Sequence, residues 1–168
     1  MKKLFLTIAL VFGFALSAQD KGLNVGVNIG IPAGDASDIS KFSFGVDATY
    51  FFWEPVANLK IGASTGYTHF IGKNYDYGYY GSYKVKDFGF VPVAATGEYR
   101  FAKQFFAGLD LGVAIATQSD SDTGFYVRPK IGWDQESYQL FAFVRHISQD
   151  TRYASALMTV GVGGAYKF

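Results

Sequence analysis

The chain contains no cysteine and only two histidines among its 168 residues. The lack of cysteine excludes disulfide bonds, thiolate metal sites and lipid attachment through a cysteine. The two histidines, His69 and His146, stand far apart in the sequence and no clustered carboxylates accompany them. The sequence therefore predicts no metal site and no cofactor.

Neither sign of charge is in excess, since 15 Lys and Arg stand against 14 Asp and Glu. Proteins that bind nucleic acid usually carry blocks of basic residues, which are missing here. We therefore expect no nucleic-acid partner.

A long apolar run is also missing, apart from Leu4–Leu16 near the N-terminus. Its 13 residues are fewer than the roughly 20 that a membrane-spanning helix needs. Lys2 and Lys3 precede the run and Ser17-Ala18 follow it, as in a secretory signal peptide. The sequence predicts a signal peptide over residues 1–18 and one domain over residues 19–168, with an uncleaved anchor helix as the alternative.

After residue 20 the chain alternates with a period of two, which indicates β-strands. Aromatic residues make up 18% of the chain and glycine contributes 20 residues, a composition that suits strands. We expect eight strands, at residues 22–31, 42–53, 59–71, 87–101, 105–117, 124–134, 138–148 and 156–168. The connections alternate between long (32–41, 72–86, 118–123, 149–155) and short (54–58, 102–104, 135–137). This arrangement predicts an all-β fold, an eight-stranded antiparallel up-and-down transmembrane β-barrel.

The charged residues of these segments fall on one face of each strand. They are Asp47, Lys60, Glu98, Arg100, Asp110, Arg128, Lys130, Asp134, Arg145 and Lys167. A basic side chain on the lipid face would cost about 2–4 kcal/mol near the midplane. Most strand glycines share the charged face, and eight strands enclose only a narrow interior. We therefore predict that the charged face points inward; a soluble lipocalin-like barrel is the alternative.

The opposite face is apolar, and its aromatic residues cluster near the segment ends. Those beside the short turns and the C-terminus predict one interfacial girdle: Phe52, Tyr99, Phe101, Phe105, Trp133, Tyr138, Tyr166 and Phe168. A second girdle would contain Phe42, Phe44, Tyr67 and Phe125. Pro92 and Pro129 lie inside predicted strands, where proline usually marks an edge or a bulge, so we expect local bulges there.

The last strand places five outward residues before the end of the chain: Val160, Val162, Gly164, Tyr166 and Phe168. This ending resembles the assembly signal of outer-membrane proteins of Gram-negative bacteria. The signal peptide, Phe90–Val93, Gly97–Phe101 and Gly161–Phe168 together resemble the small OmpA/OmpX-type, porin-like outer-membrane β-barrel family.

The resemblance implies an outer-membrane protein with both termini in the periplasm and a structural, envelope-integrity or adhesion role rather than an enzymatic one. It also implies a monomer that contacts outer-membrane lipid and lipopolysaccharide. Periplasmic chaperones and the barrel-assembly machinery would be its partners during biogenesis.

The six basic and four acidic inward residues must pair if they leave bulk water. They predict a salt-bridge network that plugs the lumen. The alternative is a narrow passive channel that prefers anions.

The connection 72–86 contains five tyrosines, Tyr75, Tyr77, Tyr79, Tyr80 and Tyr83, among glycines and a serine. Such a composition is typical of adaptable recognition surfaces. We expect either an extracellular contact surface or a plain extension of two strands above the membrane.

The pattern His146-Ile-Ser148 could pair a general base with a nucleophile, because residues two apart share one face of a strand. It resembles the outer-membrane lipid A deacylase family. That family expects Asn after the Ser and an acid on the next strand, whereas this chain has Gln149 and its last strand has no acid. A deacylase-like hydrolase is therefore only the alternative reading of this pair.

Overall fold

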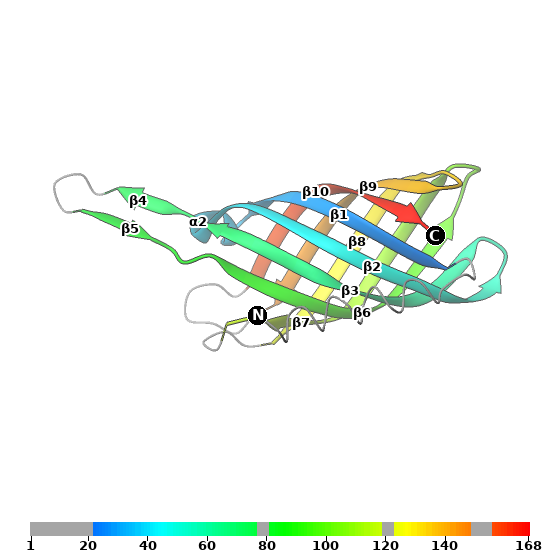
Figure 1. The fold of residues 1–168 in the computed structure, drawn as a ribbon, viewed down its shortest axis with the longest axis horizontal. Helices are drawn as coiled ribbons and strands as arrows, with labels where there is room; N and C mark the ends of the chain where they lie inside the picture. The colour runs from blue at the N-terminus through cyan, green and yellow to red at the C-terminus, as the bar shows by residue number, and fades with distance from the viewer. Residues whose placement is uncertain (1–21, 77–80, 119–122, 149–155) are drawn as a thin grey trace.

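The computed structural model describes residues 22–76, 81–118, 123–148 and 156–168. Eight strands of this part form one closed antiparallel barrel, in the order β1-β10-β9-β8-β7-β6-β3-β2 (Figure 1). They are β1 (Leu23–Ala33), β2 (Ser40–Val56), β3 (Leu59–Gly72), β6 (Phe88–Arg100), β7 (Phe105–Ala116), β8 (Gly124–Asp134), β9 (Tyr138–Ser148) and β10 (Ala156–Lys167). The predicted eight-stranded antiparallel barrel is confirmed. The signal peptide predicted over residues 1–18 lies outside the described residues.

Two further strands, β4 (Asn74–Asp76) and β5 (Ser82–Lys84), form a separate two-stranded sheet. This hairpin projects beyond one end of the barrel, and the short helix α2 (Ala36–Ile39) lies at the same end (Figure 1). We call this end the hairpin end. β1 begins and β10 ends at the opposite end, the terminal end, where Asn24 pairs with Lys167. The sequence predicted α2, β4 and β5 only as loops.

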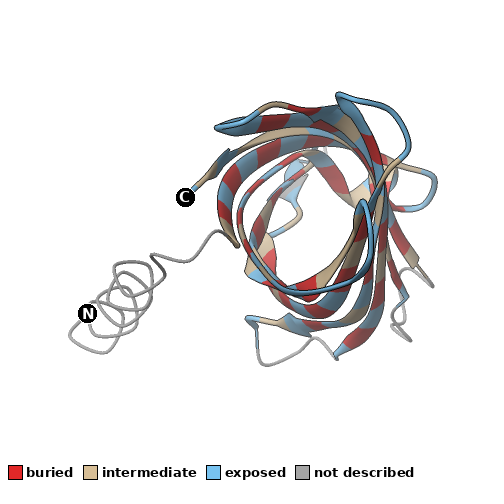
Figure 2. Ribbon diagram, turned by 90° about the vertical axis from the view of Figure 1, so that its right-hand side faces the viewer, coloured by how far each residue is buried: buried red, intermediate tan, exposed pale blue. Residues whose placement is uncertain are grey.

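Buried and exposed residues alternate along the strands (Figure 2). The inside of the barrel is largely polar, with Asp110 and Arg145 both 0% exposed. The outside is apolar, as Ile31 shows at 67% exposed. Soluble proteins bury such residues more often than any others. The prediction that the charged face points inward is confirmed, and the exposed apolar face is the reverse of what a soluble barrel would show. None of the helices in the described ranges is long and apolar enough to cross a membrane.

The predicted bulge at Pro92 is wrong. Pro92 pairs with Ala114 of β7 in an unbroken register. Against β3, the ladder runs to Thr65 paired with Val93 and resumes, in the same register, at Thr68 paired with Phe90. A proline has no backbone N–H to donate. It therefore interrupts the pairing on one side without inserting a residue.

Pro129 behaves in the same way, so the bulge predicted there is also wrong. It pairs with Leu109 of β7, while the β8–β9 ladder is interrupted between Val127 and Lys130 without a change of register. The register shifts of the barrel occur instead between β2 and β3, at both ends of β2.

Candidate functional site

The centre of the lumen holds a network of ionised side chains built around Arg128. Its Nη1 lies 2.9 Å from Asp47 Oδ2 and its Nη2 lies 2.7 Å from Asp110 Oδ2. Lys130, two residues further on the same face of β8, lies 2.7 Å from Glu98 Oε1 and 3.5 Å from Asp110 Oδ1. All five side chains are buried, so each charge depends on its partners rather than on water.

Amide side chains extend this network around the barrel. Asn28 Nδ2 donates to Asp47 Oδ2 at 2.7 Å, and Gln139 Nε2 donates to Glu98 Oε2 at 3.1 Å. Arg145 Nη2 donates to Asn28 Oδ1 at 2.8 Å, which joins the third basic residue to the network through an amide. The sequence interpretation considered charges alone and missed both amides. Both amides lie on the inward face of their strands, β1 and β9, and this position could have indicated that they belong to the network.

Arg145 differs from Arg128 because no carboxylate of the described residues lies within ion-pair distance of it. Its guanidinium carbon lies 4.9 Å from the centre of the Phe143 ring. Nε and Nη1 are buried without a hydrogen-bond partner among the described residues. Arg145 is therefore held by Asn28 and by the Phe143 ring face rather than by an opposite charge.

The other predicted lumen charges lie nearer the terminal end. Asp134 accepts hydrogen bonds from Arg100 Nη2 and, at 2.8 Å, from Lys167 Nζ. Lys60 lies 5.9 Å from the centre of the Phe51 ring and forms no ion pair with a described residue. The ten predicted residues thus form a buried central network, a cluster at the terminal end in which a buried Asp134 holds two partly exposed basic side chains, and one lysine apart from both.

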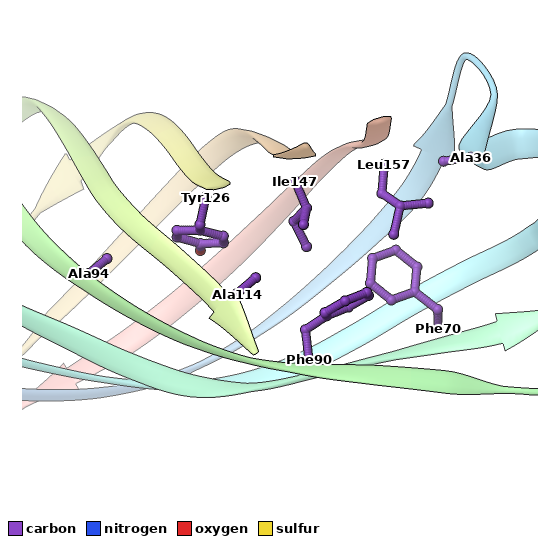
Figure 3. Packing of buried hydrophobic residues seen from close by; sticks show 8 residues of the cluster. All are labelled: Ala36, Phe70, Phe90, Ala94, Ala114, Tyr126, Ile147 and Leu157. Atoms are coloured by element: carbon purple, nitrogen blue, oxygen red, sulfur yellow. The ribbon is translucent and has the colours of Figure 1, made fainter. Parts of the chain in front are cut away.

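Apolar side chains occupy the lumen on both sides of the central network. Toward the hairpin end they are Ala36, Phe70, Phe90, Ala94, Ala114, Tyr126, Ile147 and Leu157 (Figure 3). Phe70 and Phe90 lie next to one another there, with their ring centres 6.0 Å apart. A smaller cluster contains Phe106, Phe141 and Phe143. The sequence interpretation placed charges and glycines in the lumen and missed these aromatic layers.

Among the described residues, hydrogen bonds from Tyr75 and from Lys73, which stands directly before β4, attach the hairpin to α2. The Tyr75 hydroxyl donates to the Asp38 carbonyl, and the Lys73 amide donates to the Ile39 carbonyl at 3.0 Å. Ala36, at the start of α2, is fully buried in the apolar cluster. The hairpin therefore helps to hold α2 over the lumen.

The predicted contact tyrosines are only partly described. The backbone of Tyr75 pairs with that of Tyr83 across the hairpin. Tyr77, Tyr79 and Tyr80 lie outside the described residues.

His146 and Ser148 lie on the outer face of β9, near the hairpin end. On β10, Met158 stands opposite His146 and Ala156 stands opposite Ser148. On β8, Val127 and Phe125 take the corresponding positions. None of these four cross-strand neighbours carries a carboxylate that could orient His146. Asp150, the acid nearest to Ser148 in the sequence, lies outside the described residues.

His69 is not isolated in the structure. Its Nδ1 lies 3.1 Å from the Tyr67 hydroxyl and its Nε2 lies 3.9 Å from Asp87 Oδ2. Within the described ranges, no three His, Asp or Glu side chains are grouped as a metal site would require.

Comparison with known proteins places the chain by its fold. The sequence matches no protein-family model and no curated protein sequence. The structure is similar to that of Ail, the attachment invasion locus protein of Yersinia pestis, with a TM-score of 0.55 and 15% identity over 88% of this chain and 97% of that one. It is also similar to the outer-membrane enzyme PagL, with a TM-score of 0.59 and 13% identity over 84% and 97% of the two chains. Neisserial surface protein A aligns with a TM-score of 0.50 and 16% identity over 88% and 97%.

At these identities the likeness establishes the fold. The chain has the architecture of the small eight-stranded outer-membrane barrels. Because this group contains both an attachment protein and an enzyme, the architecture alone does not select an activity.

Proposed function

We propose that this chain is a non-enzymatic outer-membrane barrel whose lumen is closed and whose hairpin presents a contact surface outside the cell. The observation that carries the proposal is the structural difference between the filled barrel and the projecting hairpin. Ion pairs and aromatic layers occupy the barrel, while β4 and β5 form a separate two-stranded sheet that extends beyond it.

The outer face of the barrel supports the membrane location. Val27, Ile29 and Ile31 of β1 are all at least half exposed, and Val160 and Val162 of β10 are 49% and 55% exposed. Such a face is stable against acyl chains and unstable against water. The exposed aromatic residues near the terminal end include Phe52, Phe105 and Tyr166, the types that favour a membrane interface.

The connection lengths support the orientation. Short turns join the strands at the terminal end, whereas the hairpin and the other long connections lie at the opposite end. Outer-membrane barrels place short turns in the periplasm and longer loops outside. Both termini would accordingly lie in the periplasm. Surface labelling of intact cells would test this: Lys84 of the hairpin should react with a membrane-impermeant amine reagent, and a Lys84→Arg variant should lose that label.

The contact role rests on the composition of the hairpin and on its attachment. Tyrosine supplies a large contact area with few rotatable bonds, and glycine and serine adapt around it. The bonds from Tyr75 and Lys73 to α2 fix the base of the hairpin to the barrel. The likeness to Ail, by name an attachment and invasion protein, supports the same role. A partner would be outer-surface glycan, lipopolysaccharide or a neighbouring cell.

The test replaces Tyr75, Tyr77, Tyr79, Tyr80 and Tyr83 together by Ser and measures adhesion of cells that display equal amounts of barrel. We expect adhesion to fall to the level of cells without the protein. The matched control replaces the same five residues by Phe, which retains the rings and removes the hydroxyls. Adhesion that is unchanged in the Ser variant would exclude the hairpin as the contact surface.

A further inference from the structure

The two sides of the hairpin base meet at one carboxylate. Gly72 ends β3 on one side, and Asp87 stands directly before β6 on the other. The Gly72 amide donates to Asp87 Oδ1 at 3.0 Å, and the Gln118 side-chain amide donates to the Asp87 carbonyl. Asp87 therefore joins the end of β3, the start of β6 and the connection that follows β7.

The second oxygen of the same carboxylate faces His69. The distance of 3.9 Å from His69 Nε2 to Asp87 Oδ2 is too long for a hydrogen bond but close enough for an ion pair. The other ring nitrogen, Nδ1, lies 3.1 Å from the Tyr67 hydroxyl. Both nitrogens of His69 thus face one oxygen each.

The surroundings hold this arrangement in place. Gly89 stands opposite His69 in the β3–β6 ladder, and a Cβ at Gly89 would lie 2.6 Å from the Tyr67 hydroxyl. The absence of that side chain leaves the space in which Tyr67 reaches His69. On the other side, the Phe44 ring of β2 lies 5.2 Å from the His69 ring, centre to centre.

Among the described residues, the titratable groups that contact His69 are Tyr67 on β3 and Asp87 before β6, while β2 contributes the uncharged Phe44. Gln118, after β7, contacts the Asp87 carbonyl through its neutral amide. Among the described residues, His69 is the only ion-pair contact of Asp87. The His69 and Asp87 side chains are 26% and 39% exposed, so the external pH acts on both.

We propose that Tyr67, His69 and Asp87 form a pH-sensitive latch at the base of the hairpin. A neutral His69 that carries its proton on Nδ1 donates to the Tyr67 oxygen, and its unprotonated Nε2 faces Asp87 without a bond, which leaves Asp87 held mainly by Gly72. On protonation, both nitrogens are donors. Nδ1–H still donates to the Tyr67 oxygen, and the new Nε2–H forms a charge-assisted bond with Asp87. This added bond restrains the carboxylate that closes the hairpin base.

The direction of the pH effect follows from the charges on His69 and Asp87. Acidification that protonates His69 adds the bond between His69 and Asp87, and the hairpin base opens less often. Where His69 is neutral the bond is absent and the base opens more often. This latch does not depend on what the hairpin contacts.

The Gly72 amide reports on the latch, because its proton lies in the bond to Asp87. The experiment measures hydrogen exchange of this amide by NMR, with the full barrel in lipid nanodiscs, from about pH 8 to about pH 5. Rates are expressed as protection factors, which remove the intrinsic pH dependence of exchange. We expect protection to rise about threefold or more on acidification. Its midpoint should coincide with that of the His69 ring resonances.

Three variants separate the latch from a plain structural role. His146→Gln removes the other histidine and should retain the full response. His69→Gln should abolish the response. Asp87→Asn should also abolish it, although its amide oxygen can still accept the Gly72 N–H bond. Constant protection in the parent protein and in His146→Gln would overturn the proposal even if the other two variants failed to fold. A response that persists in His69→Gln would overturn it as well.

Discussion

Asp110 and Arg128 face each other across the β7–β8 ladder, and one carboxylate oxygen accepts from two guanidinium nitrogens. Arg128 Nε donates to Asp110 Oδ2 at 2.8 Å, and Nη2 lies 2.7 Å from the same oxygen. Nη1 points away, to Asp47 on β2. Arg128 therefore connects neighbouring strands and also crosses the lumen to a strand on the other side.

Replacement of Arg128 by Met should destabilise the barrel by about 3–5 kcal/mol, because it leaves Asp47 and Asp110 buried without their main counter-charge. The remaining partners, Asn28 and Lys130, place the cost toward the lower end of that range. Urea unfolding in lipid vesicles would measure it. A loss below about 1 kcal/mol would mean that the network contributes little to stability.

Replacement of Arg145 by Met should cost clearly less than the same change at Arg128. Arg145 has no carboxylate partner among the described residues, so its removal leaves no unpaired acid beside it. The change loses one hydrogen bond to Asn28 and the stacking on Phe143, and it removes two buried donors without partners. The same unfolding measurement applies. An equal or larger loss at Arg145 would show that its charge balances the network from a distance.

Two strand glycines should respond differently to alanine. A Cβ at Gly112 would overlap the Val93 carbonyl oxygen, which is backbone and cannot move aside alone. A Cβ at Gly97 would meet no atom within 4 Å. We expect Gly112→Ala to reduce the folded fraction strongly, while Gly97→Ala folds as the parent does or slightly better. The shift between folded and unfolded bands on unheated SDS gels measures both, and equal behaviour would contradict the close approach at Gly112.

The barrel should not conduct ions in planar bilayers. The central network and the aromatic layers occupy its lumen in series, and eight strands leave little space besides side chains. Phe70→Ala removes one layer only, so it should also remain closed. Steady single-channel currents from the parent protein would favour the passive channel over the closed barrel.

Lipid A should be the same in cells that express the parent chain and in cells that express Ser148→Ala. The cross-strand neighbours of His146 and Ser148 include no acid to orient the base. Mass spectrometry of lipid A, with outer-membrane fractionation to show equal amounts of both proteins, decides the matter. Loss of an acyl chain with the parent alone would make His146 and Ser148 catalytic.

The strand pattern could be read from the sequence because it follows from one local rule. Side chains alternate between the faces of a strand, and a barrel gives every strand the same inside and outside. Whether Val27 or Asp47 faces outward or inward can therefore be predicted from its position in its own strand, without knowledge of the neighbouring strands. The bulges predicted at Pro92 and Pro129 are wrong because the sequence shows where a backbone N–H is missing but not whether the strand register shifts there.

Pairing within a β-hairpin is also nearly local. Asp110 and Arg128 lie on consecutive strands, and the connection between β7 and β8 sets their register. Contacts across the lumen are not local. Arg128 meets Asp47, 81 residues away, only because the tilt and stagger of eight closed strands bring β2 and β8 to the same level. The sequence predicts that both residues face the lumen, but it does not predict that they form an ion pair with each other.

The eight barrel strands, the inward face of the charged residues and the exclusion of thiol chemistry could all be predicted from the sequence, because they depend on composition and on a period of two. The three-dimensional arrangement was needed to show which charges meet, that α2 is held over the lumen, and that Tyr67, His69 and Asp87 come together. Those relationships depend on barrel closure and on the path of the connections at the hairpin end. Both are set by the sum of many weak contacts rather than by any one segment.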